Sequence, residues 1–351
     1  MKWGPPLAGG VPSSIPWVGM KPPYRIRTDL ARTVLDGFVF PLGVLPVPGL
    51  VPREGWCVDW NETGGEACCS FHVVSSLDRL SPLLHDALEL LPESNVFGIL
   101  ELGSRDAYRT VDVYLGSRGI TRSKFMDTWT LLEPLLLEEA SLAIGANSED
   151  PFIEVFLDPD KGLLIHVHPS EQQRVEAILA RHGIEQVADP GYDVDMEVLE
   201  QIGVRPVLEE QAGMICDMDQ LLLLLKHDWN LELDEDPTTN LDGRGRRIGR
   251  TLWHAVVILE TDPVGGAGHP REAHATVWGT AASRDEMELL IRERLRREHP
   301  WSVREFYALD RAAFDDRPEE IDWLSPRPDS SAVHMLQIDP LKPTTWMQAD
   351  G

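Results

Sequence analysis

The chain has 351 residues, of which 42% are hydrophobic and 26% are charged, a balance typical of folded domains rather than of disordered chains. Its 58 acidic residues outnumber its 32 Lys and Arg residues, and the formal net charge is −26. This charge argues against broad binding to nucleic acids or to anionic membranes, because both need a positive field.

The sequence also carries indications of where the protein resides. The longest apolar block, residues 221–225, is far too short to cross a membrane, and the N-terminus lacks the apolar region of a secretory signal. Four cysteines, at 57, 68, 69 and 216, form no C-x-x-C pair, which is typical of reduced thiols in the cytoplasm. The sequence therefore predicts a cytoplasmic protein that does not associate with membranes.

Proline dominates the first segment of the chain. Residues 1–52 contain ten of the 27 prolines. Because proline lacks an amide hydrogen and fixes φ, this segment is predicted to be an extended, Pro-rich leader rather than a packed domain. Its aromatic residues Trp3, Trp17, Phe38 and Phe40 are too apolar for a free tail, so part of the leader is expected to lie along the folded body.

Short strands and helices alternate after the leader. A proline at the first helical position, in Ser81-Pro82, predicts the start of one helix. A second helix is expected over residues 123–133, broken near Pro134. Apolar and β-branched runs predict the strands, which cover 57–60, 70–74, 96–102 and 108–115.

Residues 151–187 carry the clearest signals, in the order hairpin, helix, strand. Two strands, 152–157 and 163–167, flank a turn-rich stretch at 158–162. Ser170 and Gln173 predict a capping box. The helix then ends at Gly183, and the next strand covers 184–187.

The same order returns near the C-terminus. Strands over 252–260 and 273–280 precede a capping box formed by Ser283 and Glu286, a helix, and a strand over 303–309. An acidic helical stretch, 209–236, separates the two units. Whether the two units arose by duplication is left open, because hairpin–helix–strand order is common.

Hairpins precede single helices without regular βαβ alternation, which predicts an α+β fold. We expect antiparallel sheets built from hairpin-helix-strand units with helices on one face, in two domains. The predicted organisation is a Pro-rich leader (1–52), a first α+β domain (53–190), a second α+β domain with the acidic helical insert (191–325), and a C-terminal tail (326–351).

One histidine pair is the strongest candidate for chemistry. His166 and His168 are two residues apart on a predicted strand, so both imidazoles share a face. A turn centred on Asp160 places Glu154 opposite His166, and two His with one Glu can bind catalytic zinc or iron. The competing interpretation is an ordinary polar sheet face.

The same register pairs Val155 with Ile165, Ile153 with Val167 and Phe152 with His168.

The only concentrated positive patch is the loop 243–250, which contains Arg244, Arg246, Arg247 and Arg250. Such a cluster can bind phosphate or a nucleotide. Its glycine spacing is not that of a dinucleotide-binding loop, and a strand rather than a helix follows. The alternative is that these arginines pair with the chain's own carboxylates.

The sequence contains no G-x-S-x-G, H-E-x-x-H or P-loop motif, and no cofactor is predicted. With a charge of −26, the leading hypothesis is a non-catalytic acidic protein, such as a regulatory or immunity-type binder, that presents its surface to a basic protein partner. The alternative is a metal-dependent hydrolase or oxygenase that uses His166, His168 and Glu154. The oligomeric state is left open.

Overall fold

A computed structural model describes residues 24–63, 66–104, 106–192, 202–209, 218–261, 271–298 and 300–340. These residues form a mixed α+β fold that is mostly antiparallel sheet. They fall into two compact units. The larger unit takes the described residues within Trp17–Gly103 and Val113–Leu233, and the smaller takes those within Ser104–Asp112 and Asp234–Gly351. The domain limits at 52, 190 and 325 stay predictions.

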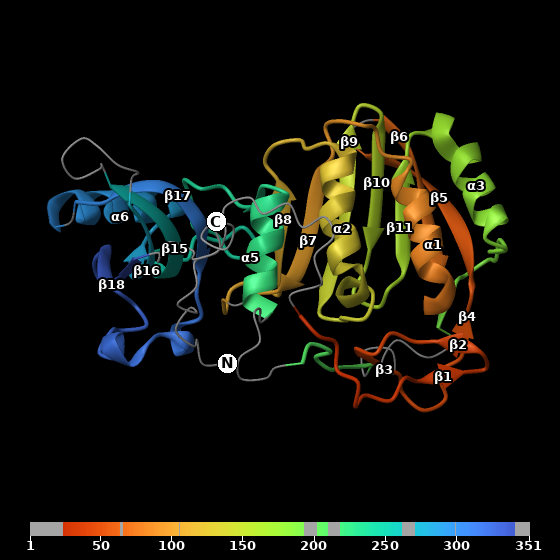
Figure 1. Ribbon diagram of the computed structural model, residues 1–351, viewed down its shortest axis with the longest axis horizontal. Helices are drawn as coiled ribbons and strands as arrows, with labels where there is room; N and C mark the ends of the chain where they lie inside the picture. The colour runs from red at the N-terminus through yellow and green to blue at the C-terminus, as the bar shows by residue number, and fades with distance from the viewer. Residues whose placement is uncertain are drawn as a thin grey trace, which may run out of the picture. The chain divides into compact units, whose positions relative to one another are not determined.

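The larger unit is built on an eight-stranded sheet of order β14-β8-β7-β9-β10-β11-β6-β5. Four helices, α1 (Leu77–Leu88), α2 (Arg122–Leu136), α3 (Gln172–Arg181) and α5 (Met218–Asp228), belong to the same unit and pack on one face of this sheet (Figure 1). The strands are β5 (Gly55–Thr63), β6 (Glu66–Val74), β7 (Phe97–Gly103), β8 (Val111–Gly116), β9 (Leu142–Glu149), β10 (Phe152–Leu157), β11 (Leu163–Val167) and β14 (Leu231–Leu233).

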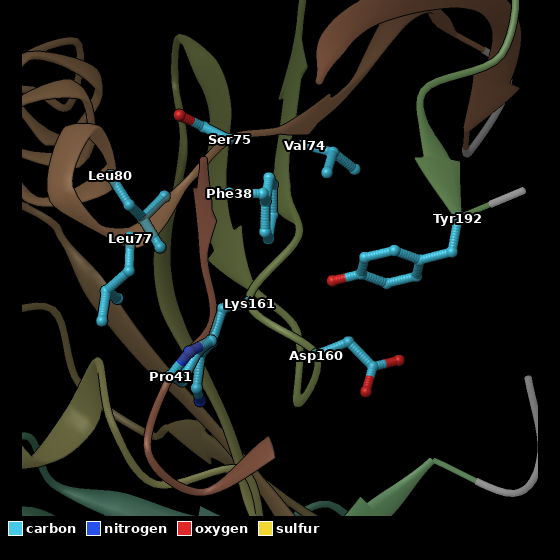
Figure 2. Close-up of a pocket in the computed structure, with 9 residues that line it drawn as sticks. All are labelled: Phe38, Pro41, Val74, Ser75, Leu77, Leu80, Asp160, Lys161 and Tyr192. Atoms are coloured by element: carbon cyan, nitrogen blue, oxygen red, sulfur yellow. The ribbon is translucent and has the colours of Figure 1, made fainter. Parts of the chain in front are cut away.

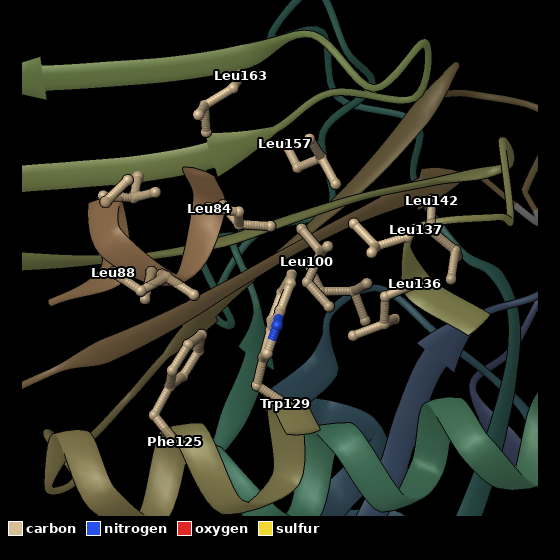
Figure 3. Packing of buried hydrophobic residues seen from close by; sticks show 14 of the residues in the cluster. Leu84, Leu88, Leu100, Phe125, Trp129, Leu136, Leu137, Leu142, Leu157 and Leu163 are labelled. Atoms are coloured by element: carbon tan, nitrogen blue, oxygen red, sulfur yellow. The ribbon is translucent and has the colours of Figure 1, made fainter. Parts of the chain in front are cut away.

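The core lies between this sheet and its helices. Side chains alternate along a strand, so every second residue of β10 and β11 faces the helices and is fully buried. Leu84 of α1 and Phe125 and Trp129 of α2 point toward Leu157 and Leu100 of the sheet (Figure 3). Each fully buried large apolar side chain contributes about 1.5–3 kcal/mol, so this layer provides the main stabilisation of the unit.

The hairpin register predicted from the sequence is confirmed. Val155 pairs with Ile165, Ile153 with Val167 and Glu154 with His166. The His168 amide donates to the Phe152 carbonyl at 3.3 Å. The turn closes because Lys161 adopts a positive φ of 67° and the Gly162 amide donates to Asp158 Oδ1.

Two prolines predicted to mark helix limits lie inside helices instead. α1 begins at Leu77, with Ser76 before it and Pro82 in its interior. α2 runs to Leu136, past Pro134. A proline removes one helical hydrogen bond, and the burial of apolar neighbours such as Leu83 and Leu135 offsets this loss.

Other local predictions near the hairpin are wrong. Residues 184–187 do not form a strand of the sheet; only an isolated parallel bridge joins Gln186 to Trp56. Ser170 does not cap α3, because a short 3-10 turn, Pro169–Glu171, precedes the helix. The sequence also gave no sign of β9, since Gly145 and Asn147 interrupt its apolar pattern.

Residues 24–52, part of the predicted leader, contain four short strands and pack on the larger unit. Phe38 and Phe40 are buried and contact Tyr192. The Tyr24 hydroxyl donates to the Leu131 carbonyl at 2.9 Å. Trp3, Trp17 and Cys216 lie outside the described residues. The strands are β1 (Val34–Leu35), β2 (Phe38–Val39), β3 (Val44–Leu45) and β4 (Pro52–Arg53); β3 and β4 pair with β13 (Gly203–Val204) and β12 (Gly191–Tyr192).

The smaller unit contains a four-stranded antiparallel sheet of order β17-β15-β16-β18, with one helix, α6, packed against it. The predicted cap of this helix is confirmed, because the Glu286 amide donates to Ser283 Oγ at 3.1 Å. The elements are β15 (Thr251–Thr261), β16 (Arg271–Ala281), α6 (Arg284–Glu298), β17 (Ser302–Arg311) and β18 (Ala332–Pro340).

The smaller unit also buries a network of charges. Arg311 Nε lies 3.0 Å from Asp106 Oδ2, and the Arg311 side chain is 1% exposed. Arg109 Nη2 lies 2.8 Å from Asp106 Oδ2 and 3.0 Å from Asp112 Oδ1, and Arg109 Nη1 lies 3.2 Å from Glu235 Oε2. Because each charge lies close to an opposite charge, Coulomb attraction offsets part of the cost of burying these groups, although Arg109 Nη2, Asp112 Oδ1 and Arg311 Nε make no hydrogen bond to another described residue.

Gly145 in the centre of the large sheet provides a test of its packing. A Cβ atom at this position would lie 2.2 Å from the Val155 carbonyl oxygen on β10, so Gly145→Ala forces the two strands apart. We expect a loss of about 2–4 kcal/mol in the free energy of unfolding, measured by urea denaturation. Gly103→Ala, which meets nothing within 4 Å, is the control. Equal effects of the two substitutions would contradict the packing described.

Candidate functional site

The sheet face opposite the helices, termed here the open face, carries the candidate site. None of the eight strands of the large sheet contains Lys or Arg. The cross-strand register places two thiols, Cys57 and Cys68, on the open face together with these acids and histidines: Asp59, His72, Glu101, Glu149, Glu154, His166 and Glu232.

A line of polar side chains crosses four strands of this face. Asn61 Nδ2 on β5 donates to Ser70 Oγ on β6 at 3.0 Å. Ser70 Oγ lies 2.8 Å from His166 Nδ1 on β11. On the other side of the ring, His166 Nε2 lies 3.8 Å from Glu154 Oε1 on β10. The line fixes the orientation of the His166 imidazole.

Burial and neighbouring charges both act on these groups. Burial lowers the pKa of His166, the adjacent Glu154 carboxylate opposes that change, and His72 adds to it. Burial also raises the pKa of Glu101, and Glu154 reinforces the increase. His72 Nε2 lies 3.9 Å from Asp59 Oδ2. The open face therefore combines several carboxylates with His166, whose burial disfavours its charged form.

The order Ser70–His166–Glu154 has the composition of a hydrolytic triad. However, Ser70 is only 3% exposed and sits mid-strand, paired with Asp59 on one side and His166 on the other. Backbone amides in such a ladder are already hydrogen-bonded, so they do not form an oxyanion hole around Ser70. The arrangement is suited to holding side chains in place on a surface.

The two predicted histidines are not held together. His166 lies beside Glu154 on the open face, whereas the exposed His168 ring bonds to Ser170, with His168 Nδ1 2.8 Å from Ser170 Oγ. Within the described part of the chain, no group of three or more His, Cys, Asp or Glu residues is arranged to hold a metal ion. The metal site of His166, His168 and Glu154 stays a prediction.

The arginine loop is organised around one carboxylate. Arg246 Nε and Nη2 lie 2.8 and 2.7 Å from Asp242 Oδ2, and the Arg244 amide donates to Asp242 Oδ1. The Arg246 amide also donates to Asp242 Oδ1 at 2.9 Å, and this bond, together with those from the Arg246 side chain and the Arg244 amide, lowers the pKa of Asp242 to about 2. Arg250 donates to Ser331 Oγ at 3.0 Å, and Arg247 forms a backbone bridge to Leu241. Anion binding by Arg244, Arg246, Arg247 and Arg250 stays a prediction.

A small pocket lies elsewhere in the larger unit, between β2, the β10–β11 turn and Tyr192 (Figure 2). Phe38, Lys161 and Tyr192 line it, and the space open to the centre of a water molecule is about 10 Å³, which is room for about one water. Lys161 Nζ donates to the Leu142 carbonyl at 2.9 Å. The buried amine therefore serves as a structural hydrogen-bond donor.

Of the polar residues on the open face, Glu154 and His166 were identified from the sequence, whereas the others were not: Asp59, Asn61, Ser70, His72, Glu101, Glu149 and Glu232. The available signal was the alternation of polar and buried residues along 68–73. This alternation indicates a strand with one buried and one polar face, but it does not identify the neighbouring strands.

Comparison with known protein families, curated proteins and solved structures gave no match. Among the described residues, no helix is long and apolar enough to cross a membrane.

The structural role of Lys161 predicts a particular pH dependence. Burial lowers the pKa of Lys161 to about 8 from an ordinary value of 10.5. Between these values the unfolded chain binds more protons than the folded protein, so this residue makes stability rise with pH from about 8 to about 10.5. Relative to Lys161→Met, the wild type should gain stability between pH 8 and 10 in urea denaturation. The exposed Lys124→Met is the control, and parallel curves for wild type and Lys161→Met would contradict the assignment.

Proposed function

We propose that the protein is a cytoplasmic, non-catalytic binding protein whose open face docks a basic protein partner. The observation that carries this proposal is the charge of the large sheet, whose strands hold acidic residues and histidines but no Lys or Arg. The described cysteines Cys57, Cys68 and Cys69 are free thiols, which supports a reducing compartment.

Among the described residues, the ion pairs formed by arginines of the larger unit go to carboxylates outside the large sheet. Arg32 pairs with Glu138, and Arg122 pairs with Glu93. These pairs lie on helices, turns and loops outside the large sheet. The negative potential of the open face is therefore not cancelled by these arginines.

The acids of this face differ in exposure: Asp59, Glu149 and Glu232 are exposed, whereas Glu101 and Glu154 are half-buried. Asp59 is 68% exposed and Glu154 is 26% exposed. A surface of one sign accelerates the encounter with a partner of the opposite sign and makes binding salt-dependent. It also repels polyanions, which is why nucleic acids and anionic membranes are excluded as partners in this proposal.

A triple variant that replaces three carboxylates of the open face with amides tests the proposal. Asp59→Asn, Glu101→Gln and Glu154→Gln together remove three open-face charges while keeping side-chain shape. The probe is a fluorescent peptide of ten lysines, with binding measured by anisotropy at about 20 mM NaCl. At about 0.5 kcal/mol per charge, the triple variant should bind about tenfold more weakly. Binding should disappear at about 0.5 M NaCl.

The matched control removes three exposed acids outside the large sheet, Asp36→Asn, Glu89→Gln and Asp127→Asn. Both triple variants have the same net charge. If the affinity fell equally in both, attraction would be a property of total charge rather than of the open face, and the proposal would be wrong.

A further inference from the structure

Strand β5 is an edge of the large sheet and is only partly covered. The Trp56 amide donates to the Glu185 carbonyl at 3.0 Å, and the Val187 amide donates to the Trp56 carbonyl at 2.9 Å. Beyond Val187 the chain leaves this edge, because Gly191 and Tyr192 pair with β4 instead.

Along the rest of the β5 edge, the N–H and C=O groups of alternate residues face away from the sheet. Since the Trp56 N–H and C=O face outward and β5 pairs with β6 without a register shift, those of Val58 and Trp60 face outward too. Among the residues that the structure describes, neither has a backbone partner on that side. Such an edge accepts an added strand.

The side chains around this edge indicate the occupant. Trp60 is 61% exposed, and an exposed indole ring attracts a Lys or Arg side chain. Asp59 points to the open face and is 68% exposed. A second copy of this chain would bring a second Asp59 to the same edge and be repelled, whereas a basic segment is attracted.

We infer that β5 accepts an extended, basic segment of the partner as an additional strand of the sheet, with Val58 and Trp60 making the backbone bonds. This inference rests on the proposed function and specifies how the partner is held. Side chains of the added strand alternate between Trp60 on one face and Asp59 on the other, so one face of the segment carries Lys or Arg toward the acids.

A proline substitution tests the backbone bond directly. Trp60→Pro removes the outward amide hydrogen while leaving the bonds between β5 and β6 intact, which proline permits on an edge strand. Trp60→Ala removes only the ring. The probe is a capped peptide of alternating Lys and Thr. We expect Trp60→Ala to weaken binding about threefold to tenfold and Trp60→Pro to weaken it about fivefold more.

A modified peptide provides the control for charge. The same peptide, N-methylated at every threonine, keeps all its positive charges but cannot form a strand ladder, so it should bind at least about tenfold more weakly. Peptide binding should also slow hydrogen exchange at the Val58 and Trp60 amides of the wild type. This measurement uses only the wild type, so it does not depend on whether the variants fold.

The possible outcomes separate this inference from the proposed function. If Trp60→Pro binds like Trp60→Ala, or if the N-methylated peptide binds as tightly as its parent, strand addition is wrong. The proposed function survives that result provided that the open-face triple variant still weakens binding of the lysine peptide. If the triple variant also binds like the wild type, both ideas fail. Dimerisation through β5, seen as a doubled mass abolished by Trp60→Pro, would likewise overturn the inference.

Discussion

Alternation of side chains along a strand is the constraint on which the larger unit depends. Burying Ile153 and Val155 beneath the helices commits Glu154, the residue between them, to the opposite face. The register carries this choice from strand to strand, so His166, Ser70 and Asp59 follow Glu154 onto the open face. The hydrophobic core and the acidic surface are two results of one pattern.

The part of this pattern that is local could be predicted from the sequence. The β10–β11 hairpin has a short turn and a strong apolar alternation. Its register, including the pairing of Glu154 with His166, therefore follows from the requirement that the apolar residues of both strands share one face. The position of Ser70 could not be predicted, because β6 precedes β11 by about ninety residues and many pairings satisfy the same alternation. His168 differs for a local reason: the Pro169 turn draws its ring toward Ser170.

Proline signals were less informative than expected. Pro82 and Pro134 lie within helices, and the proline-rich residues 24–52 are packed around Phe38 and Phe40. In each case the proline removes one backbone donor, whereas burial of the neighbouring leucines or aromatic rings contributes several kcal/mol. Tertiary burial therefore outweighs a local preference that is read from one residue.

The buried charge network of the smaller unit has a consequence for biosynthesis. Asp106 emerges from the ribosome long before Arg311, its ion-pair partner in the folded protein. At ordinary translation rates the interval is about 10 to 40 seconds. During that time only Arg109, of these two arginines, can pair with Asp106, so burial of this carboxylate is compensated less well than in the folded protein. The charge network of this unit is thus completed only after Arg311 has been made.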